Sequence, residues 1–406
     1  MIQLLMFWQI LFPMYLKQGK AVNIKSRSLS MSTFALTYLL LILSLPLSAQ
    51  TAAPGVPVSP RRAAIGGLHA ADLAGFDSIF TNPAGLASAE GEWMYSRIAL
   101  NAAGPIFDIA NMALGGTDIL SNLTSLLDPA GRLYTSMDLA TPVALGYVGK
   151  GLGIGIFNRT YVIVNAPSVT TSFLTFGEEL LLTGGYAKRF DLGEGNLLDL
   201  GIVVKGFLRN EFAWSGALTD VSTAFNDIFG GIPFNIVTGM GVDLGATWTF
   251  GDYALALTAR DAFTPYIASS YTSYNGFKAN PTANKIETVT DLMPIDLSLG
   301  FRWNPRWLFL ARTGSELTLL ADYRNIWGLF RILDRNPILE LSLGTEIVML
   351  EILSLRAGIR DTLPSAGFGL DLQVFDLSLA MYGKELGLEP GQRPVFNLDF
   401  AIDFRY

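Results

Sequence analysis

The stretch Gly239–Phe250, GMGVDLGATWTF, alternates between apolar residues and small or polar ones. One face of an extended chain would carry Met240, Val242, Leu244, Ala246, Trp248 and Phe250. The other face would carry Gly239, Gly241, Asp243, Gly245, Thr247 and Thr249. A period of two is the pattern of a β-strand whose sides meet different environments. An apolar side and a small or polar side suit a wall between lipid and a lumen.

The same alternation recurs from Glu90 to the C-terminus and predicts about fourteen strands. We expect them near residues 90–100, 137–149, 151–165, 176–191, 196–214, 235–250, 252–263, 292–304, 314–327, 337–349, 351–363, 365–374, 376–386 and 394–406. A soluble β-sandwich would also alternate, so no single strand decides between the two folds. The even number favours a closed transmembrane barrel.

The links between these strands differ in length. Short links are expected at Lys150, 192–195, Gly251, Leu350 and Phe375, and longer ones at 101–136, 166–175, 215–234, 264–291 and 328–336. Short periplasmic turns opposite long outer loops are typical of outer-membrane barrels, although 305–313 and 364 depart from the alternation. Aromatic girdles are predicted at both ends. Trp93, Tyr147, Tyr186, Trp248 and Trp303 would lie at the periplasmic end, with Trp214 and Trp327 at the outer end.

Composition places the chain in the exported class. Of its 406 residues, 50% are hydrophobic and 16% are charged. The one strongly apolar block, Phe34–Leu47, follows Lys25 and Arg27 and precedes Leu47-Ser48-Ala49, which is the order of a secretory signal peptide. We therefore expect residues 1–49 to be a leader, with residues 1–30 upstream of the true start. An anchoring helix is the alternative interpretation, which is disfavoured because the block is short of the roughly 20 residues a span needs and Pro46 interrupts its end.

Removal of residues 1–49 takes away four basic residues and no acid, so the net charge changes from −7 to −7 − 4 = −11. This acidity argues against a nucleic-acid partner. The chain has no cysteine, which excludes disulfides and thiol catalysis. The predicted organisation is all-β: a leader (1–49), an N-terminal plug inside the lumen (50–89) and an outer-membrane antiparallel β-barrel of about 14 strands (90–406).

The last thirteen residues, PVFNLDFAIDFRY, support export to the outer membrane. They alternate and end on an aromatic residue at the chain terminus. This pattern resembles the signal that the outer-membrane assembly machinery reads, so we expect that machinery and outer-membrane lipids to be partners.

The stretch Ala63–Ala87, AAIGGLHAADLAGFDSIFTNPAGLA, has too many glycines and small residues for a strand or a long helix. Asn82 is a good helix N-cap and Pro83 favours a first helical position, so a short helix is expected from Pro83 to Ala89. An ordinary turn followed by a helix is the alternative interpretation. GFDSIFTNPAGLA resembles the plug of the FadL-type outer-membrane transporters of long-chain fatty acids, and equally of related barrels without proven transport. The resemblance implies plug or gating residues, which are Phe76, Phe80, Asn82, Pro83, Ala84, Gly85 and Leu86.

Inward-facing charges are also predicted. Arg159, Lys205 and Arg209 should face the lumen and are candidates for binding an anionic head group, unless each pairs with a lumen acid. Lys205 and Arg209 are four residues apart, roughly 13 Å along a strand, so they could not grip one carboxylate together. No catalytic motif, metal-binding set or cofactor loop is present, and the single histidine, His69, is interpreted as structural. The chain is therefore expected not to be an enzyme.

The resemblance implies passive uptake of a hydrophobic small molecule, a fatty acid or similar lipid, gated by the plug. In that family the ligand leaves sideways at an inward kink in an early strand, and Gly153 and Gly155 would permit such a kink. The alternative is a FadL-like barrel without transport, serving as a docking or shuttle factor in protein export. The two alternatives remain open at the level of sequence.

Overall fold

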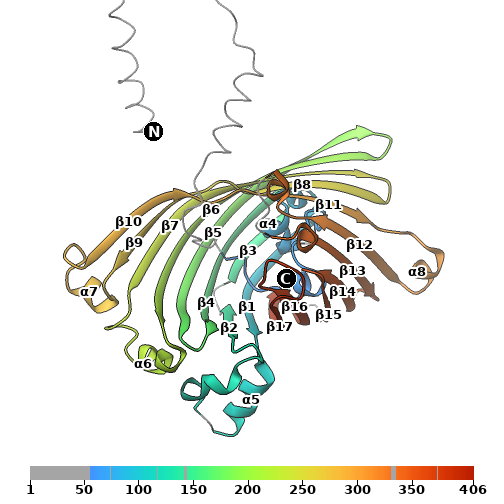
Figure 1. Ribbon diagram of the computed structural model, residues 1–406. Coiled ribbons are helices and arrows are strands. Elements are labelled where there is room, and N and C mark those ends of the chain that lie inside the picture. The colour runs from blue at the N-terminus through green and yellow to red at the C-terminus, as the bar shows by residue number, and fades with distance from the viewer. Residues whose placement is uncertain (1–54, 74, 117, 141–143, 331–334, 373) are drawn as a thin grey trace, which may run out of the picture. The chain divides into compact units, whose positions relative to one another are not determined.

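The computed structural model describes residues 55–73, 75–116, 118–140, 144–330, 335–372 and 374–406 (Figure 1). The predicted leader and residues 50–54 lie outside the described residues. In the described part, seventeen strand segments form one sheet. They are β1 Glu92–Ala103, β2 Leu133–Ala140, β3 Ala144–Gly149, β4 Leu152–Ser168, β5 Thr171–Gly193, β6 Asn196–Gly216, β7 Phe234–Phe250, β8 Tyr253–Phe263, β9 Pro265–Tyr271, β10 Lys285–Leu292, β11 Asp296–Trp303, β12 Ser315–Tyr323, β13 Leu341–Met349, β14 Leu353–Arg360, β15 Leu363–Asp371, β16 Phe375–Glu385 and β17 Pro394–Arg405.

The sheet is closed, because β1 pairs antiparallel with β17. Three of its strands are each described as two segments. β2 and β3 both pair with β1 and β4, so they are two parts of one strand. β8 and β9 both pair with β7, and their other edges pair with β11 and β10. Counting each of these pairs of segments as one strand gives fourteen strands, which confirms the predicted antiparallel β-barrel and its strand count.

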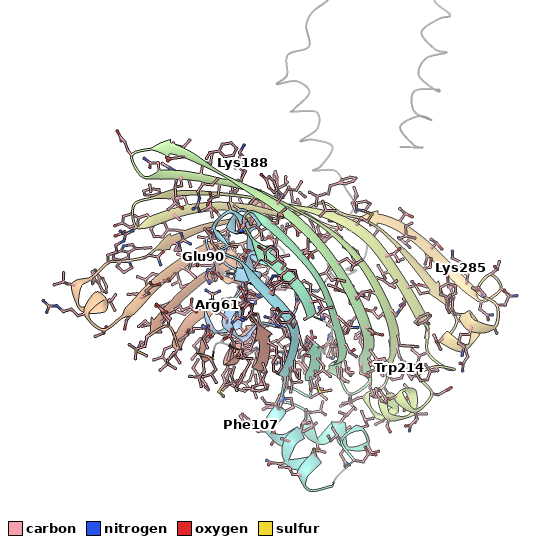
Figure 2. The ribbon with its side chains drawn as sticks, turned by 180° about the vertical axis from the view of Figure 1, so that it is seen from behind. Arg61, Glu90, Phe107, Lys188, Trp214 and Lys285 are labelled. Atoms are coloured by element: carbon pink, nitrogen blue, oxygen red, sulfur yellow. The ribbon has the colours of Figure 1, made fainter. Side chains whose placement is uncertain are left out.

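The alternation in sequence becomes two faces of the wall. In β6, Val203, Lys205, Phe207 and Arg209 are buried inside, whereas Leu200, Ile202, Val204 and Leu208 are exposed. Large apolar side chains are similarly exposed along the other strands of the barrel, where only lipid would accept them. Figure 2 shows side chains standing off both faces of the strands. Within the described residues, no helix is long and apolar enough to cross a membrane.

Two expected links are wrong. Residues 166–175 do not form a long loop, since β4 and β5 continue to a tight turn at Val169 and Thr170. Threonine suits an extended strand, and Thr171 and Thr175 belong to β5. Residues 264–291 are not a plain loop either, since they contain β9, helix α7 (Tyr274–Ala279) and β10. Helix α8 (Leu308–Arg312) explains why the 305–313 link is longer than a turn.

Gly153 and Gly155 would permit a kink in β4, the third strand of the barrel. The pairing of β4 with β3 and β5 runs through Gly153 and Gly155 without a register shift. The outer girdle is revised as well, because Trp327 lines an internal cavity and Trp214 packs against a cluster formed by the outer loops. At the other end, Trp93, Tyr186 and Trp248 are exposed as a girdle requires.

The N-terminal segment (residues 55–89) forms α3 (Pro60–Ala64), η1 (Gly75–Asp77), α4 (Ser78–Thr81) and η2 (Pro83–Ser88). Its hydrogen bonds reach wall strands far apart in sequence. Asn82 bonds Thr247 of β7, His69 bonds Asp322 of β12, and Ser365 of β15 bonds the Ala64 carbonyl. Contacts to strands on different sides of a closed sheet require that the segment lies inside it, and its blue elements lie among the strands in Figure 1.

Candidate functional site

Glycines on the inner face of the wall allow the N-terminal segment to pack closely against it. Gly201 of β6 and Gly245 of β7 are directly opposite each other. A Cβ at either position would collide with Asn82, Pro83 or Ala84. Gly344 and Gly358, also a cross-strand pair, approach the backbone of Ile65 and Gly66 in the same way. These glycines are required for close approach of two backbones.

A third pair completes the arrangement. Gly153 and Gly185 face each other across β4 and β5, and a Cβ on either would meet the Leu86 side chain at 2.7–2.8 Å. In the sequence these inward glycines look like ordinary small lumen residues, so their role in close packing of the N-terminal segment was not predicted. The available signal was a glycine on the inner face of each of two neighbouring strands, but recognising a pair requires the register.

Asn82 is fully buried and holds three parts of the structure together. Its Oδ1 accepts a hydrogen bond from the Ala84 N–H (3.0 Å), which caps η2 at Pro83 as the sequence predicts. Its Nδ2 donates to the Ala70 carbonyl (2.6 Å) and to Oγ1 of Thr247 in β7 (3.0 Å). One amide therefore fixes the turn, a neighbouring loop of the segment and the wall.

The other predicted plug residues are buried as well. Phe76, Phe80 and Leu86 belong to one apolar cluster with inward side chains of the wall. The Phe80 ring meets the Phe157 ring edge-on, with centroids 5.0 Å apart. Ala84 is fully buried. Gly85 packs so closely that a Cβ would lie 2.7 Å from Cβ of Ser78. The structure brings these residues together; a gating role for them stays a prediction.

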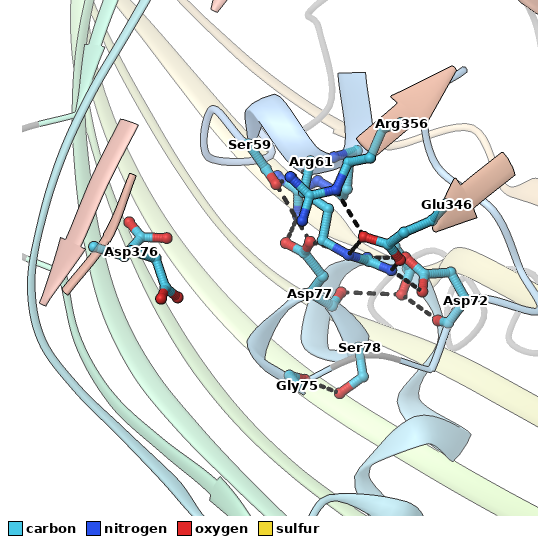
Figure 3. Close-up of polar contacts among 12 residues, drawn as sticks. Ser59, Arg61, Asp72, Gly75, Asp77, Ser78, Glu346, Arg356 and Asp376 are labelled. Atoms are coloured by element: carbon cyan, nitrogen blue, oxygen red, sulfur yellow. Dashed lines mark hydrogen bonds and ion pairs between the residues drawn. The ribbon is translucent and has the colours of Figure 1, made fainter. Parts of the chain in front are cut away.

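An ionic network ties the segment to β13 and β14 (Figure 3). Arg61 contacts Asp72 (2.6 Å) and Glu346 of β13 (2.7 Å), and Glu346 also accepts from Arg356 of β14 (2.7 Å). Arg62 pairs with Asp77 at 2.9 Å. Burial alone would raise the pKa of the Asp77 carboxyl, but Arg62 and Arg61 outweigh it and hold the pKa below its usual value. The sequence pattern does not predict this network, because its partners are far apart along the chain.

His69 makes a second polar anchor. Its Nδ1 lies 2.5 Å from Asp322 and its Nε2 lies 2.6 Å from the Ile65 carbonyl, and the side chain is fully buried. The two ring nitrogens therefore each face an oxygen atom, one on the wall and one in the segment. The imidazole bridges the segment and β12, a geometry that suits the structural interpretation of His69.

The predicted lumen cations are placed inside, each with an acidic partner. Arg159 pairs with Asp138 at 2.7 Å. Arg209 pairs with Glu179 at 2.5 Å. Lys205 pairs with Asp243 at 2.8 Å and Asp261 at 2.9 Å. An anion would have to compete with these carboxylates, so none of the three cations is an isolated anion-binding group.

A cavity of about 440 Å³ lies between the segment and the wall. Its volume falls within the usual range of small-molecule sites, roughly 300–1,000 Å³. The lining has an apolar part and a charged part. The apolar part includes Leu68, Ile79, Phe80, Leu181, Val203, Pro294 and Ile295, and the charged part includes Lys205, Asp243, Arg260, Asp261 and Asp296.

The wall is interrupted beside this cavity. β8 pairs with β11 as far as Arg260 opposite Asp296, and β9 pairs with β10 from Pro265 opposite Leu292. Residues 261–264 and 293–295 lie between these two ladders. One backbone hydrogen bond crosses the interval, from the Met293 N–H to the Thr264 carbonyl (2.9 Å).

Asp261 lies at the centre of the interruption. Its φ of 51° is unusual for a residue other than glycine, and such a conformation needs support from its surroundings. The support is a hydrogen bond from its N–H to Asp243 (2.6 Å) and contacts of its carboxylate with Lys205 and Thr264. Three residues of β8 (260–262) lie opposite the single residue Asp243 of β7 at this point. Lys205, Asp243 and Asp261 therefore stabilise a bulge in the wall beside the cavity.

These observations define a class: a fourteen-strand transmembrane β-barrel of the outer membrane, with its own N-terminal segment in the lumen. The described residues contain no group of acids and histidine that could hold a metal. No family model matches the chain, and no curated protein matches it.

Similar solved structures exist. The Pseudomonas putida toluene transporter TodX is 13% identical, with 87% of this chain and 98% of that chain covered and a TM-score of 0.46. The CymD monoaromatic hydrocarbon channel is 13% identical, covering 86% and 97%, with a TM-score of 0.45. A Pseudomonas aeruginosa FadL homologue is 14% identical, covering 87% and 99%, with a TM-score of 0.42. These matches concern the fold.

Proposed function

We propose that the barrel is a passive outer-membrane transporter of hydrophobic molecules, with long-chain fatty acids as the expected substrates. The observation that carries the proposal is the cavity between the N-terminal segment and the interrupted wall. Leu181 and Val203 of the wall and Ile79 and Phe80 of the segment give it an apolar surface. An apolar molecule bound there would be shielded from water on both sides. The fatty-acid assignment rests on the resemblance of the N-terminal motif.

The charged part of the cavity suits the same use. The Lys205 ammonium is already matched by two carboxylates, and Arg260 is paired with Asp296. These charged groups are therefore already paired with one another, and the apolar lining of the cavity is left to contact a hydrocarbon chain. Asp261, Pro294 and Ile295 border the cavity directly, so the interruption of the wall is the proposed exit for an apolar molecule into the bilayer.

Filling the cavity should weaken binding. We expect Leu181→Trp to weaken binding of a fluorescent long-chain fatty acid by roughly tenfold or more, which corresponds to about 1.4 kcal/mol. Leu181 is buried and lines the cavity, whereas its neighbour Leu182 faces outward and is 48% exposed. Leu182→Trp is therefore the matched control and should bind like the parent. Displacement titration with palmitate measures both. If the parent protein binds no hydrophobic ligand, the proposed function fails and a docking role in protein export becomes the better explanation.

Closing the interrupted wall should slow the release of bound fatty acid without preventing its binding. Thr264 and Met293 are joined by a backbone hydrogen bond, so cysteines at these positions are close enough for a disulfide. We expect the oxidised T264C/M293C protein to transfer bound fatty acid into the proteoliposome bilayer more slowly, and reduction to restore the rate.

A matched pair controls for the cross-link itself. Thr345 and Ala357 are opposite each other in the uninterrupted ladder of β13 and β14. Oxidised T345C/A357C should transfer at the parental rate. Equal transfer by oxidised and reduced T264C/M293C would place the exit elsewhere while leaving the binding result intact.

A further inference from the structure

Helix α5 (Ile106–Leu114, nine residues) is apolar on two opposite sides. On one side, Ile109 and Met112 pack against the apolar cluster formed by the outer loops. On the other side, Phe107 is 62% exposed and Leu114 is 88% exposed. No residue of the helix is buried. Asp108 and Asn111 are the polar residues of the helix. A helix with apolar side chains on two opposite sides needs an apolar environment on both, and the protein supplies it on one side only.

The exposed side of α5 continues the outer face of the wall. The Phe107 ring lies 5.9 Å from the ring of Phe396, which faces outward on β17. The Gly104 N–H, just before the helix, donates to the Phe396 carbonyl (2.9 Å). On neighbouring β2, Met137 is 51% exposed on the same outer face. Figure 2 shows Phe107 on α5 at one end of the strands.

The length of β17 indicates the level of this surface in the membrane. β17 has twelve residues, which extend roughly 40 Å along the strand. At the usual tilt of about 40°, this covers roughly 30 Å along the membrane normal, the thickness of the hydrocarbon core. Phe396 near one end of β17 and Phe404 near the other therefore lie close to the two boundaries. Helix α5 emerges at the outer one.

We propose that α5 lies in the interface of the outer leaflet, with the side of Phe107 and Leu114 in contact with lipid. The lipid-facing wall continues into this side of the helix, so one apolar surface extends from the strands to α5. The single charged residue of the helix, Asp108, lies on the flank between the two apolar sides and can reach water. This contact is independent of whether the lumen transports anything.

The test uses the absence of native cysteine. An environment-sensitive fluorophore is attached to L114C in vesicles of phosphatidylcholine and phosphatidylglycerol, with or without bromine on the acyl chains. We expect emission shifted to the blue and quenching roughly twofold stronger than for a control label, because bromine is confined to the bilayer. The control is A130C, exposed in the same outer loop. Circular dichroism and heat-modified gel mobility confirm that both barrels are folded.

Equal quenching of L114C and A130C would overturn the proposal. A blue shift in detergent that grows with protein concentration would also overturn it, because it would assign this side of α5 to a second copy of the chain.

Discussion

Deletion of residues 63–87 is expected to leave a folded barrel that admits small hydrophilic solutes. Closure of the barrel rests on strand pairing, above all of β1 with β17, and none of that pairing involves the deleted residues. Barrels of eight strands fill themselves with side chains, while those of 16–18 strands leave an aqueous channel. Fourteen strands lie between these sizes. In this barrel the inner face carries glycines where the segment packs against it. Without the segment these positions leave open space.

Liposome swelling with sugars of increasing size measures the leak, and circular dichroism measures the fold. Deletion of residues 274–279, which form α7 in an outer loop, is the control and should not leak. An intact deleted barrel without a leak would show that another part of the chain closes the lumen.

The period-two pattern of the sequence was enough to predict the barrel. Each strand carries its own alternation, so the prediction needed no information about partners. The interruptions of strands were not predictable in this way. Residues 261–264 still read as a strand or a strand end, and only pairing with residues 293–295 shows that the ladder stops there.

The contacts of the N-terminal segment depend still more on tertiary structure. Asn82 could be assigned its capping role from its neighbour Pro83, because that interaction is local. The ion pair of Arg61 could not be predicted in this way, because its partner Glu346 is 285 residues away in sequence. Arg159, Lys205 and Arg209 were correctly oriented by alternation, but their acidic partners on other strands decide whether they are free to bind an anion.

Alanine at the paired glycines Gly201 and Gly245 is expected to displace the N-terminal segment without opening the barrel wall. Each new Cβ would overlap the Asn82–Ala84 backbone or side chain, and that part of the segment is packed on all sides. Overpacking of this kind costs about 1–3 kcal/mol for each site. The wall itself tolerates alanine in a strand, so the strain falls on the segment.

The measurement is the reaction of S78C with a hydrophilic maleimide. Ser78 is fully buried in the segment, and cysteine is close to it in size. We expect G201A/G245A to raise the labelling rate roughly tenfold or more, since about 1.4 kcal/mol of lost docking energy changes the open population tenfold. Gly206→Ala is the matched control: Gly206 is on the same strand β6, but its Cβ would meet open space. If the double variant labels no faster than Gly206→Ala, the paired glycines are not what seats the segment, and the polar anchors at Arg61 and His69 hold it without them.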